Sequence, residues 1–142
     1  MNYPMPAYHF IVEWGGSRVG MIEVSGLGGW ADVISNRDSA SAENSPFKLP
    51  GLVHYQNIVF KRALMKGDNE FFQWFNTIAF GKVERRDILI SLLDEHHSPV
   101  VRWKVKNAWP VKIDYAALRS CASDMAIEIL ELAHEGMTVE NS

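Results

Sequence analysis

The chain has 142 residues, of which 47% are hydrophobic and 22% are charged, and its formal net charge is −3 at pH 7. These values are typical of a globular protein with its own core, so residues 1–142 are expected to form a single domain. Its apolar runs are far shorter than the ~20 residues that span a bilayer, so no membrane anchor is expected. Its slight negative charge argues against sequence-specific nucleic-acid binding, which is therefore not expected either. The first residues lack the basic and apolar regions of a secretory signal, so synthesis in the cytoplasm is expected.

The N-terminal part of the chain has the alternating pattern of β-strands. In residues 8–14, large apolar side chains that include Val12 and Trp14 occupy every second position, which predicts a strand. Gly15-Gly16 can take the positive φ angles of a tight hairpin turn, and residues 18–25 are predicted to return as a second strand. A group of glycines at positions 26, 28 and 29 then interrupts the pattern.

Residues 35–46 form a small polar segment, SNRDSASAENSP, in which no apolar side chain is larger than alanine. Such a segment cannot bury a core face, so it is predicted to be a loop. Loops of this length inside a compact domain are often functional. Two interpretations stay open: a simple surface excursion, or a segment that becomes ordered against a partner.

One helix is predicted over Asp68–Phe80, after a turn at Pro50-Gly51 and a long strand over 52–65. Asp68 is a suitable N-cap residue, and Gly81 can end the helix in the left-handed conformation. Large apolar side chains of this segment recur at i, i+3, i+4 and i+7, namely Phe71, Trp74, Phe75 and Ile78. An aromatic helix in a chain that otherwise alternates as strands predicts a mainly β fold with the helix packed against it.

Further strands are predicted over 85–92 and 100–106, joined by the polar loop DEHHSP at 94–99. The second of these strands has apolar side chains on one face and cationic ones on the other: Val101, Trp103 and Val105 against Arg102, Lys104 and Lys106. Pro110 cannot donate a hydrogen bond to a partner strand, so a bend or bulge is predicted near Trp109. Residues 125–135 fit either a helix or a strand, and periodicity alone slightly favours the helix.

The sequence contains no set of residues with catalytic or metal-binding spacing. His96 and His97 are adjacent, so their side chains would point apart on a strand, and no third ligand is spaced to join them. Cys121 is the single cysteine, which excludes an internal disulfide, and no histidine motif is placed to activate it. The sequence therefore predicts that the protein is not an enzyme and uses neither a metal nor another cofactor.

Seven blocks of the sequence resemble, in order and spacing, the inner-tube proteins of contractile phage tails. The likeness is strongest to the tube proteins of extracellular contractile injection systems, which are phage tail-like particles that deliver toxins. It extends from about Tyr3 to Glu140. The blocks are VEWGG (12–16), EVSGL (23–27), KLPG (48–51), DNEFFQW (68–74), RRDILISLLDE (85–95), VVRWKVKNAWPVK (100–112) and IEILELAHEG (127–136).

The resemblance implies a small β-barrel of two packed antiparallel sheets with one flanking α-helix at 68–80, related in fold to the haemolysin-coregulated protein of type VI secretion. In that family, hexameric rings join their sheets edge to edge and stack into a hollow tube. The implied function is structural: the tube is driven through a target envelope when a surrounding sheath contracts, and it conducts cargo. The resemblance also favours a strand over 125–135.

The implied partners are other copies of the chain, sheath subunits, the baseplate hub, tube-terminating proteins and protein cargo, in an extracellular or phage particle. Residues 35–46 correspond to a protruding loop or hairpin that reaches the adjacent ring, although Asn36-Arg37-Asp38-Ser39 lacks the glycine of the YREG-like turn that relatives often carry. The expected inter-ring contacts are Tyr3, Pro4, Asn36, Arg37, Asp38, Glu43 and Asn44. The expected lumen-facing side chains are Asp87, Ser91, Arg102, Lys104 and Lys106.

Two alternative functions stay open. A type VI secretion ring protein would share the fold but not the long tube inside a sheath. A monomeric β-barrel that binds a small ligand, of the lipocalin type, would need a closed apolar pocket.

Overall fold

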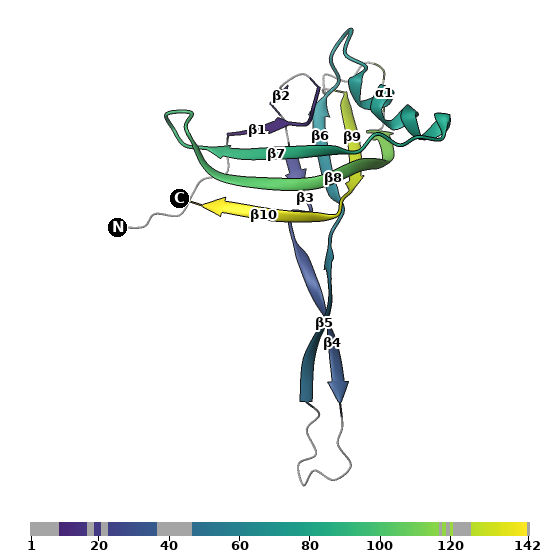
Figure 1. Cartoon of the computed structure of the whole chain (residues 1–142). Coiled ribbons are helices and arrows are strands. Elements are labelled where there is room, and N and C mark those ends of the chain that lie inside the picture. Colours follow the sequence, from purple (N-terminus) through teal and green to yellow (C-terminus); the bar gives the residue numbers. More distant parts are fainter. Residues whose placement is uncertain are drawn as a thin grey trace.

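A computed structural model of the chain describes residues 9–16, 19–20, 23–36, 47–116, 118, 120 and 126–141. Figure 1 shows a compact body of strands and one short helix, from which a long two-stranded hairpin projects. The elements in chain order are β1 (Phe10–Glu13), β2 (Val19–Gly20), β3 (Glu23–Ser25), β4 (Gly29–Asn36), β5 (Phe47–Tyr55), β6 (Ile58–Ala63), α1 (Glu70–Asn76), a 3-10 helix (Thr77–Phe80), β7 (Arg86–Leu93), β8 (Pro99–Tyr115), β9 (Ile127–Ala133) and β10 (Gly136–Asn141).

The body consists of two antiparallel sheets that share one strand. Sheet 1 contains β2, β1, β7, the first half of β8, and β10 on the other side of β8. Sheet 2 contains the second half of β8 followed by β9, β6 and β3. Figure 1 shows the strands of sheet 1 lying across those of sheet 2. The prediction of a mainly β fold with two antiparallel sheets and one flanking helix is confirmed.

Strand β8 passes from sheet 1 to sheet 2 at a bulge beside Pro110. Its 17 residues pair with β7 and β10 in their first half and with β9 in their second half. The register to β9 shifts between Pro110 and Lys112, where the missing backbone N–H of proline interrupts the ladder. The predicted bulge near Trp109 is therefore confirmed, and it allows one strand to serve both sheets.

The core lies between the two sheets, and its side chains come from alternate positions of each strand. Sheet 1 contributes Val12, Trp14, Ile88, Ile90, Val105 and Ala108, while sheet 2 contributes Ile58, Phe60, Leu130 and Leu132. Helix α1 covers the space between the sheets with Phe71 and Trp74. The Trp14 ring makes an edge-on contact with Phe71 at 5.0 Å between centroids and lies 5.5 Å from Trp74. This aromatic cluster explains why a helix of seven residues holds its place.

The helix is shorter than the predicted span of 68–80. It runs from Glu70 to Asn76 and continues as a 3-10 helix that ends at Gly81, whose φ of 79° is left-handed as predicted. Asp68 is not the N-cap residue: that position is Asn69, and its side chain makes no capping hydrogen bond. The Asp68 carboxylate still accepts a hydrogen bond from the Glu70 backbone N–H at 3.1 Å, so it satisfies one free donor of the first turn.

A buried ionic cluster joins sheet 2 to the start of the helix. Arg62 on β6 lies opposite Glu128 on β9, and each residue is 1% exposed. The Arg62 guanidinium donates to Glu128 at 2.9 Å and, through its other nitrogens, to both oxygens of Asp68. It also lies 3.8 Å from the centre of the Phe71 ring. Burial and the nearby Glu128 carboxylate raise the pKa of Tyr115, whose hydroxyl donates to Glu128.

Several strand boundaries differ from the prediction. The predicted strand over 18–25 is two strands, because β2 pairs with β1 whereas β3 pairs with β6. The predicted turn at Pro50-Gly51 is wrong, because both residues lie inside β5 (Phe47–Tyr55). The predicted single strand over 52–65 is strand in most of its residues, but it covers the end of β5 and all of β6, which begins at Ile58. The strand interpretation of 125–135 is confirmed by β9. Strand β10, which pairs with β8, was not predicted.

Candidate assembly surfaces

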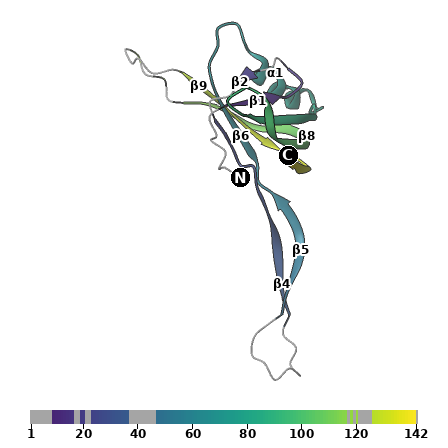
Figure 2. The ribbon, with the colours of Figure 1, turned by 90° about the vertical axis from the view of Figure 1, so that its left-hand side faces the viewer.

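The β4–β5 hairpin projects from the body on the side away from α1 (Figures 1 and 2). Within the described residues its two strands pair only with each other, from Gly29 opposite Tyr55 to Asn36 opposite Phe47. Pro50 lies inside β5, next to the bulge between Ala31 and Val33, where an unpaired edge tolerates proline. An isolated two-stranded hairpin is only marginally stable in water, so this one needs contacts that the described part of the chain does not supply.

The hairpin carries large apolar side chains that are exposed to solvent. Leu52 is 72% exposed, and Val33 and Phe47 are each 65% exposed. Other exposed apolar side chains of the hairpin are Trp30, Ile34, Leu49 and Val53. An apolar surface of this extent marks an interaction site. We call the set Trp30, Val33, Ile34, Phe47, Leu49, Leu52 and Val53 the apolar stem.

Sequence-based prediction placed the contact surface on the polar segment 35–46 and missed the apolar stem. The signal for the stem is the run from Phe47 to Val53, in which apolar residues occur at both odd and even positions. A strand with one buried face would show strict alternation, so this run indicates a strand that is covered on both faces.

The predicted inter-ring residues lie at the far end of the hairpin or outside the described residues. Asn36 is the last residue of β4 and pairs with Phe47. Arg37, Asp38, Glu43 and Asn44 fall between the two strands, and they lie outside the described residues, as do Tyr3 and Pro4. Their contacts therefore stay a prediction.

The second candidate surface is the outer face of sheet 1, which turns away from the core. Directly opposed residues of antiparallel strands share a face, and two rows cross the sheet in this way. One row contains Ile11, Ser91, Arg102 and Glu140, and the other contains Glu13, Leu89, Lys104 and Thr138. The structure thus places the predicted lumen residues Ser91, Arg102 and Lys104 on one face. Ser91 is the least accessible of them, at 7% exposed.

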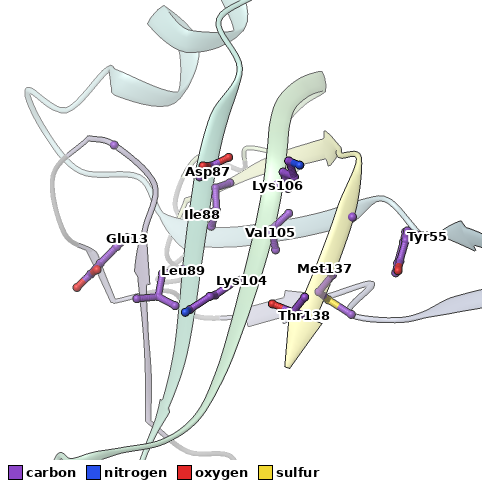
Figure 3. Close-up of a pocket in the computed structure, with 12 residues that line it drawn as sticks. Glu13, Tyr55, Asp87, Ile88, Leu89, Lys104, Val105, Lys106, Met137 and Thr138 are labelled. Atoms are coloured by element: carbon purple, nitrogen blue, oxygen red, sulfur yellow. The ribbon is translucent and has the colours of Figure 1, made fainter. Parts of the chain in front are cut away.

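An open groove runs along this face (Figure 3). Its lining comes from β1, β7, β8 and β10, together with Gly15 and with Tyr55 of β5, and includes Asp87, Leu89, Lys104, Lys106 and Thr138. Asp87 and Lys106 are therefore part of the same surface as the rows above, although Asp87 is also bonded through its carboxylate to the Asn107 backbone N–H at 3.1 Å. The face carries charges of both signs beside apolar side chains such as Ile11 and Leu89.

An exposed ion pair crosses from β8 to β10 on the same face. The Lys104 ammonium lies 2.8 Å from a carboxylate oxygen of Glu140. This hydrogen bond, together with the positive charge of Lys104, holds the pKa of Glu140 below its ordinary value. The pair connects the last strand of the sheet to its neighbour.

The borders of sheet 1 form the third candidate surface. In the described part of the chain, β10 pairs with β8 on one side and leaves its other edge without a partner strand. At the opposite border, β2 pairs with only two residues of β1. Exposed strand edges with free N–H and C=O groups are templates for pairing with another chain. The fold and its surfaces thus define a class of protein: a mainly β domain with a packed core, a free sheet border and an exposed apolar hairpin among its described residues.

The histidine loop after β7 has a structural explanation. The Asp94 carboxylate accepts hydrogen bonds from the backbone N–H groups of Ser98 at 2.9 Å and His96 at 2.8 Å. Both bonds lower the pKa of Asp94, and the bond from Ser98 has the larger effect.

No group of three or more His, Cys, Asp or Glu side chains among the described residues is arranged to hold a metal ion. Cys121 lies outside them. No described helix is long and apolar enough to cross a membrane.

Comparison with known proteins gives the family. The model of the T4-like virus tail tube protein gp19 family matches residues 6–138. The chain therefore belongs to the family of T4-like virus tail tube proteins, the tube proteins of contractile injection systems. Because this is a structural family without enzymatic activity, the prediction that the protein is not an enzyme is confirmed. No curated protein matches the chain.

Solved structures of injection-system tubes superpose on the whole chain. A chain from the cryo-EM structure of the anti-feeding prophage tube-terminating cap has 31% identity and a TM-score of 0.90, over 100% of this chain and 94% of that chain. A chain of the PVC extracellular contractile injection system, in its extended sheath–tube complex, has 30% identity and a TM-score of 0.89, over 99% of this chain and 93% of that one.

The fold also resembles that of the type VI ring proteins. Hcp1 from Flavobacterium johnsoniae has a TM-score of 0.63 over 95% of this chain and 97% of that chain, at 14% identity. At this identity the likeness concerns the fold alone, and it confirms the predicted relation to the haemolysin-coregulated protein.

Proposed function

We propose that copies of this chain close into hexameric rings, which stack into a hollow inner tube of a contractile injection particle. In this proposal residues 1–142 act as one tube domain. The observation that carries it is the projecting hairpin with its apolar stem, which a solitary molecule would leave in water. Membership in the tail tube family supplies the setting.

Within a ring, the free edge of β10 would pair with the β1–β2 border of the next copy. Such a head-to-tail contact closes when the rotation between copies divides a full turn, and it removes the exposed edges of sheet 1. The outer face of sheet 1, with its charged side chains, would then line the channel. Asp87, Ser91, Arg102, Lys104 and Lys106 would contact passing cargo without offering it a large apolar patch.

Between rings, the hairpin would reach the adjacent ring. The apolar stem would be covered there, and Asn36, Arg37, Asp38, Glu43 and Asn44, with Tyr3 and Pro4, would form polar contacts at its end. A tube of this kind would be surrounded by sheath subunits and would end at baseplate and terminator proteins, as solved relatives occur in a sheath–tube complex, a terminating cap and a baseplate. Contraction of the sheath would drive the tube and its protein cargo through a target envelope.

The alternative of a monomeric ligand-binding barrel has little support, because the space between the sheets is filled by Trp14, Phe71 and Trp74. The type VI alternative rests on likeness of fold alone.

Negative-stain electron microscopy of the purified protein tests the proposal. We expect stacked rings for the wild-type chain, and folded protein with impaired stacking for the double variant Arg37→Ala, Asp38→Ala. Wild-type molecules that stay solitary at high concentration would contradict the tube. Tubes of normal length from the double variant would contradict the inter-ring assignment alone.

A further inference from the structure

The orientation of the hairpin is set at its root. Because β4 and β5 pair only with each other within the described residues, no ladder fixes their angle to the body. At the root, the Gln56 backbone N–H donates to the Gly28 carbonyl at 3.0 Å, and the Asn57 amide donates to Glu131 of β9 at 3.0 Å. Gly26 adopts a φ of 84° there, and a Cβ at that position would lie 2.0 Å from the Asn57 carbonyl oxygen.

His134 links this root to the turn between β9 and β10. Its Nε2 lies 3.0 Å from the Gln56 carbonyl oxygen, and its Nδ1 lies 3.2 Å from the Gly136 backbone nitrogen. Its ring also packs against Tyr55, the last residue of β5, at 5.5 Å between centroids. The imidazole thus contacts the end of the hairpin and the first residue of β10 at the same time.

These two hydrogen bonds require one protonation state of the imidazole. The Gly136 N–H can only donate, so Nδ1 must be the acceptor and carry no hydrogen. The carbonyl of Gln56 can only accept, so Nε2 must carry the hydrogen. A second proton would go to Nδ1 and would face the Gly136 N–H, which breaks that bond.

From this geometry we infer that His134 is a positioning residue that couples the hairpin root to the β9–β10 turn, and that this coupling depends on its Nε2–H donor to the Gln56 carbonyl. The inference rests on the proposed function, in which the hairpin contacts the adjacent ring and β10 contacts the neighbour within the ring. His134 makes the angle between these two surfaces a fixed property of the protomer.

The titratable and charged groups around His134 come from each element that packs near it. Tyr55 contacts its ring, and Glu131 of β9 is bonded to Asn57. Glu135, the next residue, accepts a hydrogen bond from the Asn107 amide, and its backbone N–H donates to the carbonyl of Lys106. Both carboxylates therefore have bonds of their own, and the hydrogen bonds of the imidazole go to backbone groups.

Spin-label distance measurements on the dilute protomer test the inference without requiring tubes. Labels are attached at Leu49→Cys on the hairpin and Arg85→Cys on the body, in a Cys121→Ser background. At pH 7.5 we expect one narrow distance for the protein with His134, because the root is tied to the β9–β10 turn. A broad distribution would overturn the inference.

Two substitutions separate the hydrogen bonds from ring packing. His134→Phe keeps a ring against Tyr55 but has no nitrogen, so the narrow distance should broaden. His134→Gln keeps a neutral donor for the Gln56 carbonyl, so it should retain the narrow distance. If His134→Phe matched the wild-type distribution at pH 7.5, the hydrogen bonds would have no positioning role.

A matched control addresses the other histidine nearby. His54 lies within the hairpin, where its Nε2 is 2.8 Å from Asp32. His54→Phe should leave the narrow distance in place, and broadening equal to that of His134→Phe would show that the effect is not specific to His134. Negative-stain electron microscopy of the same samples then measures assembly separately. Absence of tubes from every variant and from the wild type would contradict the proposed function, while the distances would still decide the role of His134.

Discussion

The body and the hairpin of this protein both consist of antiparallel strands, but apolar side chains are buried in the body and exposed in the hairpin. In the body, Phe60, Ile90 and Leu130 are almost fully buried between two sheets and a helix. In the hairpin, Phe47 and Leu52 are mostly exposed. Within the described residues no third layer covers the two strands of the hairpin. The body therefore buries its apolar side chains between its own elements, whereas the described part of the chain leaves those of the hairpin uncovered.

The largest effect on the body is expected from truncating its aromatic cluster. Trp74 is 1% exposed and donates through its indole N–H to the Glu84 carbonyl at 2.7 Å. Trp74→Ala should lower the free energy of unfolding by about 3–5 kcal/mol, because it leaves a cavity and an unsatisfied carbonyl. Denaturant titration measures this, with Gln73→Ala on the exposed face of the helix as the control. An unchanged midpoint for Trp74→Ala would remove the helix from the core.

The next largest effect concerns the buried ionic cluster. Glu128→Ala should cost about 3 kcal/mol, near the lower end for a broken buried pair, because Arg62 keeps its bonds to Asp68. The double variant Arg62→Met, Glu128→Leu should cost less than Glu128→Ala, since apolar residues of similar size leave no charge buried without its partner. A double variant that is less stable than the single one would show that the ions themselves stabilise sheet 2.

The hairpin should give the reverse pattern. Phe47→Ser together with Leu49→Ser should change the free energy of unfolding of the protomer by no more than about 0.5 kcal/mol, because both side chains lie on the surface and are 65% and 50% exposed. The same variant should fail to form tubes in electron micrographs. Phe80→Ser, which changes an exposed side chain on the helix side, is the matched control for general loss of apolar surface. A clear drop in protomer stability would mean that the body covers the stem.

The smallest effect is expected on the outer face of sheet 1. The Lys104 hydrogen bond lowers the pKa of Glu140 from its ordinary value near 4.5, so Lys104→Gln should raise that pKa. A carboxyl whose pKa is lowered in the folded state stabilises the fold above its ordinary pKa, and this contribution is lost as pH falls through the lowered value. Carboxyl-resolved NMR titration of both proteins measures the difference. Identical titration curves would mean that the ion pair does not form in solution.

Strands are assigned from the sequence most reliably where one face of the strand is exposed to solvent and the other is buried. The alternation of Val101, Trp103 and Val105 with cationic residues is visible because only one side of that part of β8 meets the core. The boundary between β5 and β6 was missed because Gln56 and Asn57 are neither glycine nor proline. The stem was missed because its two faces carry similar side chains, which removes the period on which strand assignment depends.

Strand β9 shows a different cause of ambiguity. Glu128 occupies an inward position in line with Leu130 and Leu132, where a pattern-based assignment expects an apolar residue. Its partner Arg62 is far away in the sequence, so pairing cannot be read from local spacing. Among the candidate sites, the lumen residues could be proposed from the alternation of side chains combined with the resemblance. The role of His134 could not, because the fold alone brings the end of β9, the end of the hairpin and the start of β10 together.

Because β8 crosses from one sheet to the other as a continuous peptide, a force on either sheet reaches its partner through covalent bonds as well as through side-chain packing. The two layers of the body therefore cannot slide past each other unless the ladders along this strand are broken residue by residue. In a tube that is pushed against a resistant barrier, each subunit would therefore bear the force with two sheets that are joined by the continuous backbone of β8.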